Sequence, residues 1–188
     1  MPNPPESDEP RTDEALMKAY VDGDHAAFKA LFARYAPMLM RLTARHLRSD
    51  ELAREVVQQT FFQMHAARRD FHQDRKLRPW VFTIAMNLVR EHYRKKGRRK
   101  ETELDELRQP AERPERGPLE TKERARLLRA AMQTLPASQR EVVELHWFEE
   151  RSFAEVAEIV GTTEGAVRVR AHRAYRRLKE LLAEELGA

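Results

Sequence analysis

The chain contains no cysteine among its 188 residues. Disulfide bonds, thiolate nucleophiles and cysteine-ligated zinc sites are therefore excluded, as is common in a reducing compartment. No apolar run approaches the roughly 18 residues that a membrane-spanning helix needs. Residues 1–5 also lack the basic and apolar segments of a secretory signal. We therefore expect a cytoplasmic protein without membrane insertion.

Glycine is scarce, with six residues, and no glycine-rich loop for binding phosphate is present. The seven histidines are scattered, and none has the helical pairing with a glutamate that marks a zinc hydrolase. No serine lies in a nucleophile elbow. Acidic residues are plentiful, but carboxylate pairs in a highly charged helical chain are usually surface ion pairs. We expect a protein that is not an enzyme and needs neither metal nor cofactor.

Aromatic residues are also few, at 7%, whereas 35% of residues are charged and 41% hydrophobic. These proportions suit small helical bundles with wide solvated faces. The formal net charge is only +4, but residues 94–100 hold six bases and no acid, and residues 1–20 hold five acids and two bases. This clustering suggests a polyanion as the partner of one part of the surface, and a basic or protein partner elsewhere.

Residues 1–100 divide into a lead and a first bundle. Four prolines and three acids in residues 1–11 predict a disordered lead. Residues 12–100 have a helical pattern and are expected to form the bundle. Pro37 is expected to kink or split one of its helices. Helix starts are predicted at a cap or at a first-turn proline: Asp24, Ser49 or Asp50, and Pro79.

The second half of the chain begins with an acidic segment. Seven acids, three bases and three prolines between Glu101 and Glu120 predict a flexible linker over residues 101–118. Residues 119–188 are expected to form a second bundle, in which Ser138 with its glutamate three residues on is interpreted as a capping box. The predicted fold class is all-α, with two small helical bundles joined by the linker.

The end of the second bundle has the pattern of a helix-turn-helix. Ser152 and Glu155 form a capping box, and Gly161 suits the left-handed end of a short helix. Thr162 or Thr163 then caps a second helix. One side of that helix is apolar and is expected to face the core, at Val167, Ala171, Ala174 and Leu178.

The opposite side of this last helix is basic. From residue 163 to 179 there are six Arg or Lys residues against a single acid. A helix with such one-sided charge fits the DNA major groove, where arginine forks onto guanine edges and reaches phosphates. A merely solvated face is the alternative, which the coincident cap signals disfavour. The candidate DNA-binding residues are Arg168, Val169, Arg170, His172, Arg173 and Arg176.

A second candidate nucleic-acid region lies in the first bundle. Residues 70–76 form a polar loop with an aromatic ring and cations, which suits the capture of an unstacked base. The helix that follows carries polar and basic residues on one face, able to track phosphates or touch base edges. The alternatives are that Phe71 and Trp80 are core residues and that the basic tail only aids solubility. The candidates are Phe71, His72, Gln73, Arg75, Asn87, Arg90, Arg94 and Lys95.

Several short motifs occur in an order and spacing that is highly specific in combination. They are Asp22-Gly23-Asp24 with Phe28, Leu31, Phe32 and Tyr35; Val57-Gln58-Gln59-Thr60-Phe61; Arg78-Pro79-Trp80-Val81 with Ile84-Ala85-Met86-Asn87; Leu135-Pro136 with Arg140; and Glu155-Val156-Ala157 running to Gly165-Ala166-Val167-Arg168-Val169-Arg170. Over residues 13–182 the chain resembles the bacterial RNA polymerase sigma factors, in particular the small extracytoplasmic-function (ECF) group of the sigma-70 family.

The resemblance implies that the first bundle reads and melts the minus-ten element of a promoter and that the second reads the minus-thirty-five element. It also implies core RNA polymerase as a partner, with the second bundle resting on the flap of the second-largest subunit. The family commonly has an inhibitory anti-sigma factor, which adds such a protein to the candidate partners. The residues that would dock on the largest subunit are Glu55, Gln58, Gln59 and Phe62.

Four residues depart from the usual family pattern. Gln59 stands in place of an acid and His65 in place of a tryptophan. Met86 replaces an arginine, and Val169 replaces a small polar residue on the reading face, where it suits a thymine methyl group. Two other functions remain open: a stand-alone helix-turn-helix regulator, which would dimerise on a palindrome, and a helical adaptor that never binds DNA.

Overall fold

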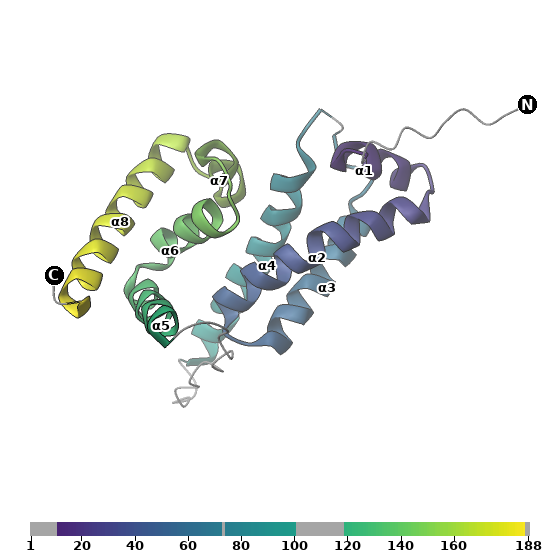
Figure 1. The fold of residues 1–188 in the computed structure, drawn as a ribbon. Coiled ribbons are helices and arrows are strands. Elements are labelled where there is room, and N and C mark those ends of the chain that lie inside the picture. Colours follow the sequence, from purple (N-terminus) through teal and green to yellow (C-terminus); the bar gives the residue numbers. More distant parts are fainter. Residues whose placement is uncertain (1–10, 73, 101–118, 187–188) are drawn as a thin grey trace, which may run out of the picture.

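The structure, a computed structural model, describes residues 11–72, 74–100 and 119–186 (Figure 1). Every regular element within these ranges is a helix, which confirms the predicted all-α class. None of the described helices is long and apolar enough to cross a membrane. The predicted linker of residues 101–118, and the predicted lead except for Arg11, lie outside the described residues.

The first bundle consists of four helices. They are α1 (Asp13–Val21), α2 (His25–Leu47), α3 (Asp50–Ala66) and α4 (Leu77–Lys100). Asp24 caps α2 by accepting hydrogen bonds from the backbone N–H groups of Ala26 and Ala27, and these bonds lower the pKa of its carboxyl. Ser49 caps α3, as the sequence predicts. Helix α1, capped by Thr12, was not singled out in advance.

One predicted detail of this bundle is wrong. Helix α4 begins at Leu77, so Pro79 occupies its third position and not its first. The amide nitrogens of the first helical turn have no intrahelical acceptors, so a proline is still tolerated there. Of the two outcomes expected at Pro37, a kink or a split, the structure excludes the split, because α2 continues as one helix through that position. Packing of α2 along its length against α1, α3 and α4 outweighs the cost of the proline.

Polar side chains tie α1 to the other helices of the bundle. The Tyr35 hydroxyl in α2 donates to Asp13 at 2.6 Å, and burial together with this carboxylate raises the pKa of Tyr35. Arg34 pairs with the same carboxylate at 2.7 Å. Glu14 accepts from the backbone N–H of Leu77 at 3.0 Å, which satisfies one of the donors that have no partner within the helix at the start of α4. Helix α1 thereby anchors the first turn of α4.

The second bundle consists of α5 (Leu119–Thr134), α6 (Ala137–Val143), the π-helical segment η1 (Glu144–Phe148), α7 (Phe153–Val160) and α8 (Glu164–Leu186). The predicted capping box at Ser138 is wrong. The capping position of α6 is Pro136, which makes no side-chain capping bond, and Ser138 lies within the helix. Because Pro136 fixes an extended backbone just before the helix, α6 starts two residues earlier than a cap at Ser138 would place it.

The predicted helix-turn-helix is confirmed as α7 and α8. Ser152 accepts from the backbone N–H of Glu155 at 3.2 Å, and the Glu155 carboxylate accepts from the Ser152 N–H at 2.9 Å. Partial burial raises the pKa of this carboxyl, but the bonds from Ser152 and the nearby Arg151 charge outweigh that effect and lower it overall. Gly161 ends α7 with φ of +69°, a left-handed conformation that glycine adopts at little cost. Thr163 caps α8.

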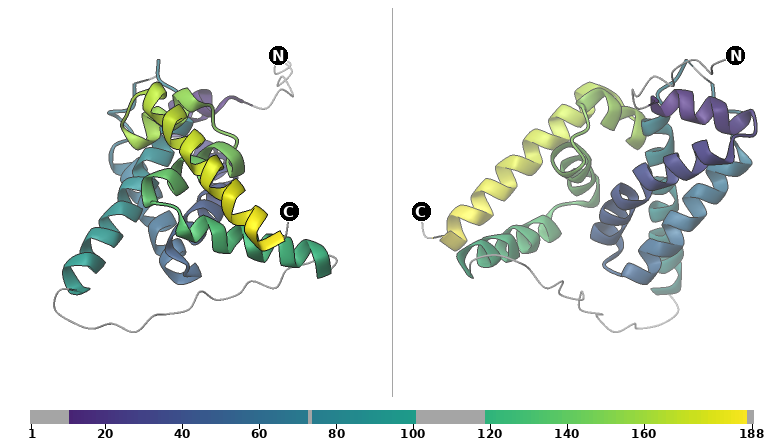
Figure 2. Two further views of the ribbon diagram at one scale, coloured as in Figure 1. Left: turned by 90° about the vertical axis from the view of Figure 1, so that its left-hand side faces the viewer. Right: turned by 45° about the vertical axis from the view of Figure 1, so that its right-hand side comes forward.

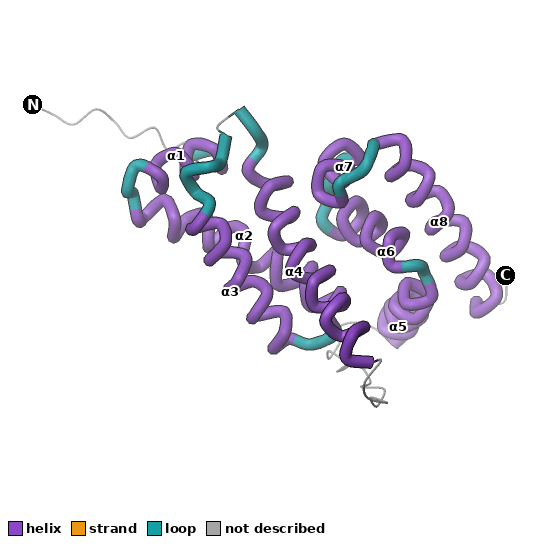
Figure 3. Tube along the Cα trace, turned by 180° about the vertical axis from the view of Figure 1, so that it is seen from behind, coloured by secondary structure: helices purple, strands orange, loops and turns teal. Residues whose placement is uncertain are grey.

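The two bundles pack against each other through α4 and α7 (Figures 1 and 2). Apolar residues of both join one continuous core, in which Val89 of α4 and Ile159 of α7 are fully or almost fully buried. Seen from behind, α4 lies beside α6 and α7, and α8 lies on the far side of the second bundle (Figure 3). The four residues predicted as the apolar stripe of α8, Val167, Ala171, Ala174 and Leu178, are all buried.

We predict that Ser152→Ala lowers the free energy of unfolding by about 1 kcal/mol, the usual cost of removing a side-chain cap. Ser138→Ala is the matched control and is expected to change it by less than about 0.5 kcal/mol, since Ser138 is exposed and caps nothing. Urea titrations followed by circular dichroism measure both. Equal losses in the two variants would contradict the capping assignment.

Candidate nucleic-acid interface

Helix α8 presents a basic face to solvent. Its apolar stripe is held against α5, α6 and α7, which fixes the rotation of the helix and turns the opposite side outward. Arg170 is half-buried, and Val169 is exposed over 49% of its surface. The other predicted reading residues are exposed: Arg168, His172, Arg173 and Arg176. The structure therefore brings the six predicted residues together on one helix, and five of them are exposed.

Arg168 is held in place at the start of this face. Its guanidinium pairs with Glu164 at 2.5 Å and lies 4.9 Å from the centre of the Phe153 ring. Both charged side chains are largely exposed, so the ion pair contributes little stability. The cation–π contact with Phe153 orients the guanidinium without burying it. Arg168 is therefore pre-positioned beside the turn of the helix-turn-helix.

The predicted base-binding loop is only partly available. Phe71 is half-buried and packs against Trp80, with ring centres 5.1 Å apart. Both rings contact the core of the first bundle, as the alternative interpretation supposed. His72 and Arg75 are exposed, and the loop is closed by a backbone bond of 3.0 Å between them. Gln73 lies outside the described residues.

The predicted face of α4 is in part occupied by the second bundle. Arg90 donates to Asn87 at 2.8 Å and pairs with Glu141 of α6 at 2.5 Å. The same guanidinium lies 3.5 Å from the backbone oxygen of Ile159 in α7. Arg94 and Lys95, nearer the end of α4, are exposed, and Lys95 pairs with a glutamate of its own helix at 2.8 Å.

Further charged contacts join the bundles, and sequence reasoning missed all of them. Arg45 pairs with Glu149, and the Nε2 atom of His46 lies 2.5 Å from a carboxylate oxygen of Glu144. The side chains of Glu144 and Glu149 are 3% and 2% exposed. The sequence gives a single indication that one of these carboxylates is buried: Glu144 stands between two apolar residues of a core stripe.

The proposed polymerase-binding residues line one exposed face of α3. Glu55, Gln58, Gln59 and Phe62 recur at steps of three, one and three, so they share one side of the helix, and all four are exposed. The Phe62 side chain is exposed over 64% of its surface, and Phe32 of α2 over 46%. Two large aromatic rings at the surface of the same bundle are typical of a protein-binding site.

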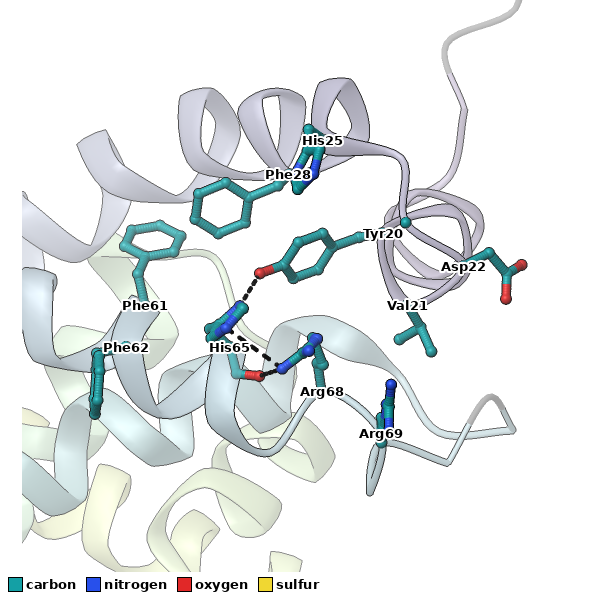
Figure 4. Close-up of a pocket in the computed structure, with 11 residues that line it drawn as sticks. Tyr20, Val21, Asp22, His25, Phe28, Phe61, Phe62, His65, Arg68 and Arg69 are labelled. Carbon is teal, nitrogen blue, oxygen red and sulfur yellow. Dashed lines mark hydrogen bonds between the residues drawn. The ribbon is translucent and has the colours of Figure 1, made fainter.

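A pocket of about 650 Å³ adjoins this face. It lies between the end of α1, the start of α2 and the end of α3, and Phe28, Phe61 and Phe62 form its apolar side (Figure 4). The Tyr20 hydroxyl points across it to a hydrogen bond with His65. No motif in the sequence predicts the pocket. The bond does give His65 a structural role at the position where the family usually has tryptophan.

Met86 also has a clear structural role, since it is 1% exposed and belongs to the continuous apolar core. An arginine at this position, as is usual in the family, would place an unpaired charge in the core of this protein. The remaining departures, Gln59 and Val169, are exposed. Of the four departures, Met86 is therefore buried and His65 is hydrogen-bonded within this chain, whereas Gln59 and Val169 change surfaces that are available to partners.

Comparison with known proteins agrees with this arrangement. Residues 31–99 match the family description "Sigma-70 region 2", and residues 125–178 match "Sigma-70, region 4". RNA polymerase sigma factor CarQ of Myxococcus xanthus is 34% identical over 89% of this chain and 96% of its own length. ECF RNA polymerase sigma factor SigM of Mycobacterium tuberculosis is 30% identical over 92% of this chain and 85% of its own.

The fold is also similar to a solved structure, that of the sigma factor RpoE in complex with the anti-sigma factor NepR from Bartonella quintana. The two chains superpose with a TM-score of 0.72 at 28% identity, over 82% of this chain and 96% of RpoE. A paired region 2 and region 4, near-complete relatives and a matching fold lead to one assignment. The protein belongs to the ECF group of the RNA polymerase sigma factors of the sigma-70 family.

Proposed function

We propose that this sigma factor binds core RNA polymerase through the exposed face of α3, reads the minus-thirty-five element with α8, and reads and melts the minus-ten element with the first bundle. The observation that carries the proposal is the one-sided basic surface of α8, which is held outward by a buried stripe on a capped helix-turn-helix. The protein directs transcription initiation at promoters, and we infer that it works in the cytoplasm without catalysing a reaction itself.

The α8 surface suits contact with the major groove. Arginine binds guanine through two parallel hydrogen bonds, and the first turns of a recognition helix are the part that reaches base edges. Because α8 begins at Glu164, Arg168 lies in its second turn and Arg173 in its third. Val169 offers an apolar contact to a thymine methyl group. This combination supports a promoter preference distinct from that of relatives with a polar residue at that position.

Melting requires binding energy from the first bundle. Unstacking and unpairing a base costs a few kcal/mol, which a protein offsets by binding the exposed base and its backbone. His72 and Arg75 are exposed beside the start of α4 and are the described loop residues best placed for this role. Phe71 is less available because it packs against Trp80. We infer that base capture relies on the cationic and imidazole groups more than on this ring.

Polymerase would make the two DNA contacts act together. Each bundle offers only a small reading surface, so each alone is expected to bind DNA weakly. When both are held on one large enzyme at the promoter spacing, the second contact becomes intramolecular and its effective concentration rises. An anti-sigma factor, of the kind that RpoE binds in its solved structure, is a further proposed partner that would oppose this assembly.

We predict that Arg173→Ala reduces promoter-specific run-off transcription about tenfold or more, because one base contact is worth roughly 1–3 kcal/mol of discrimination. Lys179→Ala, which removes a cation further along α8, is the control and is expected to keep most of the activity. Both variants should bind core polymerase as the wild type does. Unchanged discrimination between promoter and mutated minus-thirty-five sequences in Arg173→Ala would contradict the assignment of α8.

We also predict that Phe62→Ala weakens binding to core polymerase about thirtyfold or more, since a truncated aromatic anchor commonly costs at least about 2 kcal/mol. Its 64% exposure means that the variant should keep its thermal stability. Gln63→Ala, at the next exposed position of α3, is the control. Competition against labelled wild-type protein measures both affinities, and equal binding by Phe62→Ala would exclude this face as the docking site.

A further inference from the structure

The pocket between α1, α2 and α3 has an aromatic side and a basic side. Its aromatic rings come from all three helices, and the ring of Phe62 is the most exposed of them. Among the described lining residues, Asp22 is the only acid, and its carboxylate points away from the cavity (Figure 4). The aromatic residues are Tyr20, Phe28, Phe61 and Phe62, and the basic residues are His25, His65, Arg68 and Arg69.

The two arginines of this pocket have no carboxylate partner within the described part of the chain. Arg68 donates instead to the backbone oxygen of His65 at 2.7 Å, and Arg69 is exposed at the rim. Burial raises the pKa of the Tyr20 hydroxyl, and the nearby Arg68 charge offsets part of that rise. The positive charge of Arg68 therefore acts on the interior of the pocket, where an anionic group would be favoured.

Residues 1–10 of the lead have a composition that matches both sides of the pocket. They contain four prolines and three acids, and no Lys, Arg or His. Proline-rich segments favour the extended polyproline II conformation and dock in grooves that are lined by aromatic rings. Carboxylates form charge-assisted hydrogen bonds with arginine. The acids are Glu6, Asp8 and Glu9, and they follow directly after a pair of prolines at positions 4 and 5.

This segment is attached close to the pocket. The guanidinium of Arg11, the next residue of the chain, pairs with Asp24 at 3.4 Å. Asp24 stands between Gly23 and His25, which both line the pocket. Ten extended residues span up to roughly 33–36 Å, and the carboxylates of Glu6 to Glu9 come within roughly 18 Å of Arg11 along the chain. The tether is therefore long enough for both the acids and the prolines to enter.

We propose that residues 1–10 occupy this pocket of the same chain, with prolines against the aromatic rings and carboxylates at Arg68 and Arg69. Attachment gives the segment an effective concentration on the order of 1 mM, so a weak contact suffices. The inference goes beyond the proposed function, and only one consequence rests on that function. Phe62 also belongs to the proposed polymerase-binding face, so polymerase displaces the segment from this ring.

The test asks whether a free peptide of residues 1–10, amidated at its last residue, enters the pocket of the full-length protein. The wild type is compared with a chain that carries Glu6→Gln, Asp8→Asn and Glu9→Gln, whose own segment has lost its charge. NMR shifts of the backbone amides of Gly23, His65 and Arg69 report the binding. We expect a Kd of about 0.1 mM for the neutralised chain and about tenfold weaker binding to the wild type, whose pocket is then filled about 90% of the time.

Variants of the pocket and of the peptide test each side of the contact. In the neutralised chain, Arg69→Gln is expected to weaken peptide binding about threefold, and about tenfold when combined with Arg68→Gln. Arg54→Gln is the matched control, because it removes the same charge from an exposed position of α3 outside the pocket, and it should change the affinity less than about twofold. A peptide with Pro4→Ala and Pro5→Ala should bind about threefold more weakly. Circular dichroism verifies that each protein variant stays folded.

Equal affinity of the peptide for the wild type and the neutralised chain would overturn the proposal. Shifts outside the pocket, or no binding to the neutralised chain at millimolar peptide, would overturn it as well. Self-association of the wild type alone, measured by light scattering, would assign the pocket to the lead of a second copy and contradict occupancy within one chain. No arm of this test contains polymerase or DNA, so run-off transcription tests the proposed function separately.

Discussion

Burial of acidic side chains from one bundle against basic side chains of the other is the interaction on which the observed arrangement depends. Glu144 and Glu149 are almost fully buried in this arrangement, where His46 and Arg45 are their respective partners. Apolar packing between α4 and α7 adds the bulk of the contact. A single guanidinium, that of Arg90, links this contact to the surface proposed to read DNA.

Local features of this fold could be predicted because they depend on residues within one or two helical turns. The cap at Asp24, the capping box of Ser152 and the left-handed Gly161 each need only neighbours in the sequence. The buried stripe of α8 follows from its helical spacing in the same way. These short-range rules also place the basic residues of α8 on the outer face, so this half of the candidate site was accessible from the sequence.

The remainder depends on residues far apart in the chain. Ser138 has the sequence pattern of a cap, but Pro136 fixes the backbone earlier and α6 begins without it. Glu141 was interpreted as the partner of Ser138, whereas its carboxylate lies on Arg90 of the other bundle. No periodicity or spacing rule reports such a pairing, because it is decided by how two finished bundles fit together. The roles proposed for the DNA- and polymerase-binding residues stay predictions for the same reason.

The most direct measurement uses the absence of cysteine, which allows two labels to be introduced without background. One cysteine in place of exposed Arg54 in α3 and one in place of exposed Lys179 in α8 would report the separation of the bundles by energy transfer or electron–electron resonance. The account predicts a single short distance in the free protein and a longer one when core polymerase is bound. The same distance in both states would contradict it.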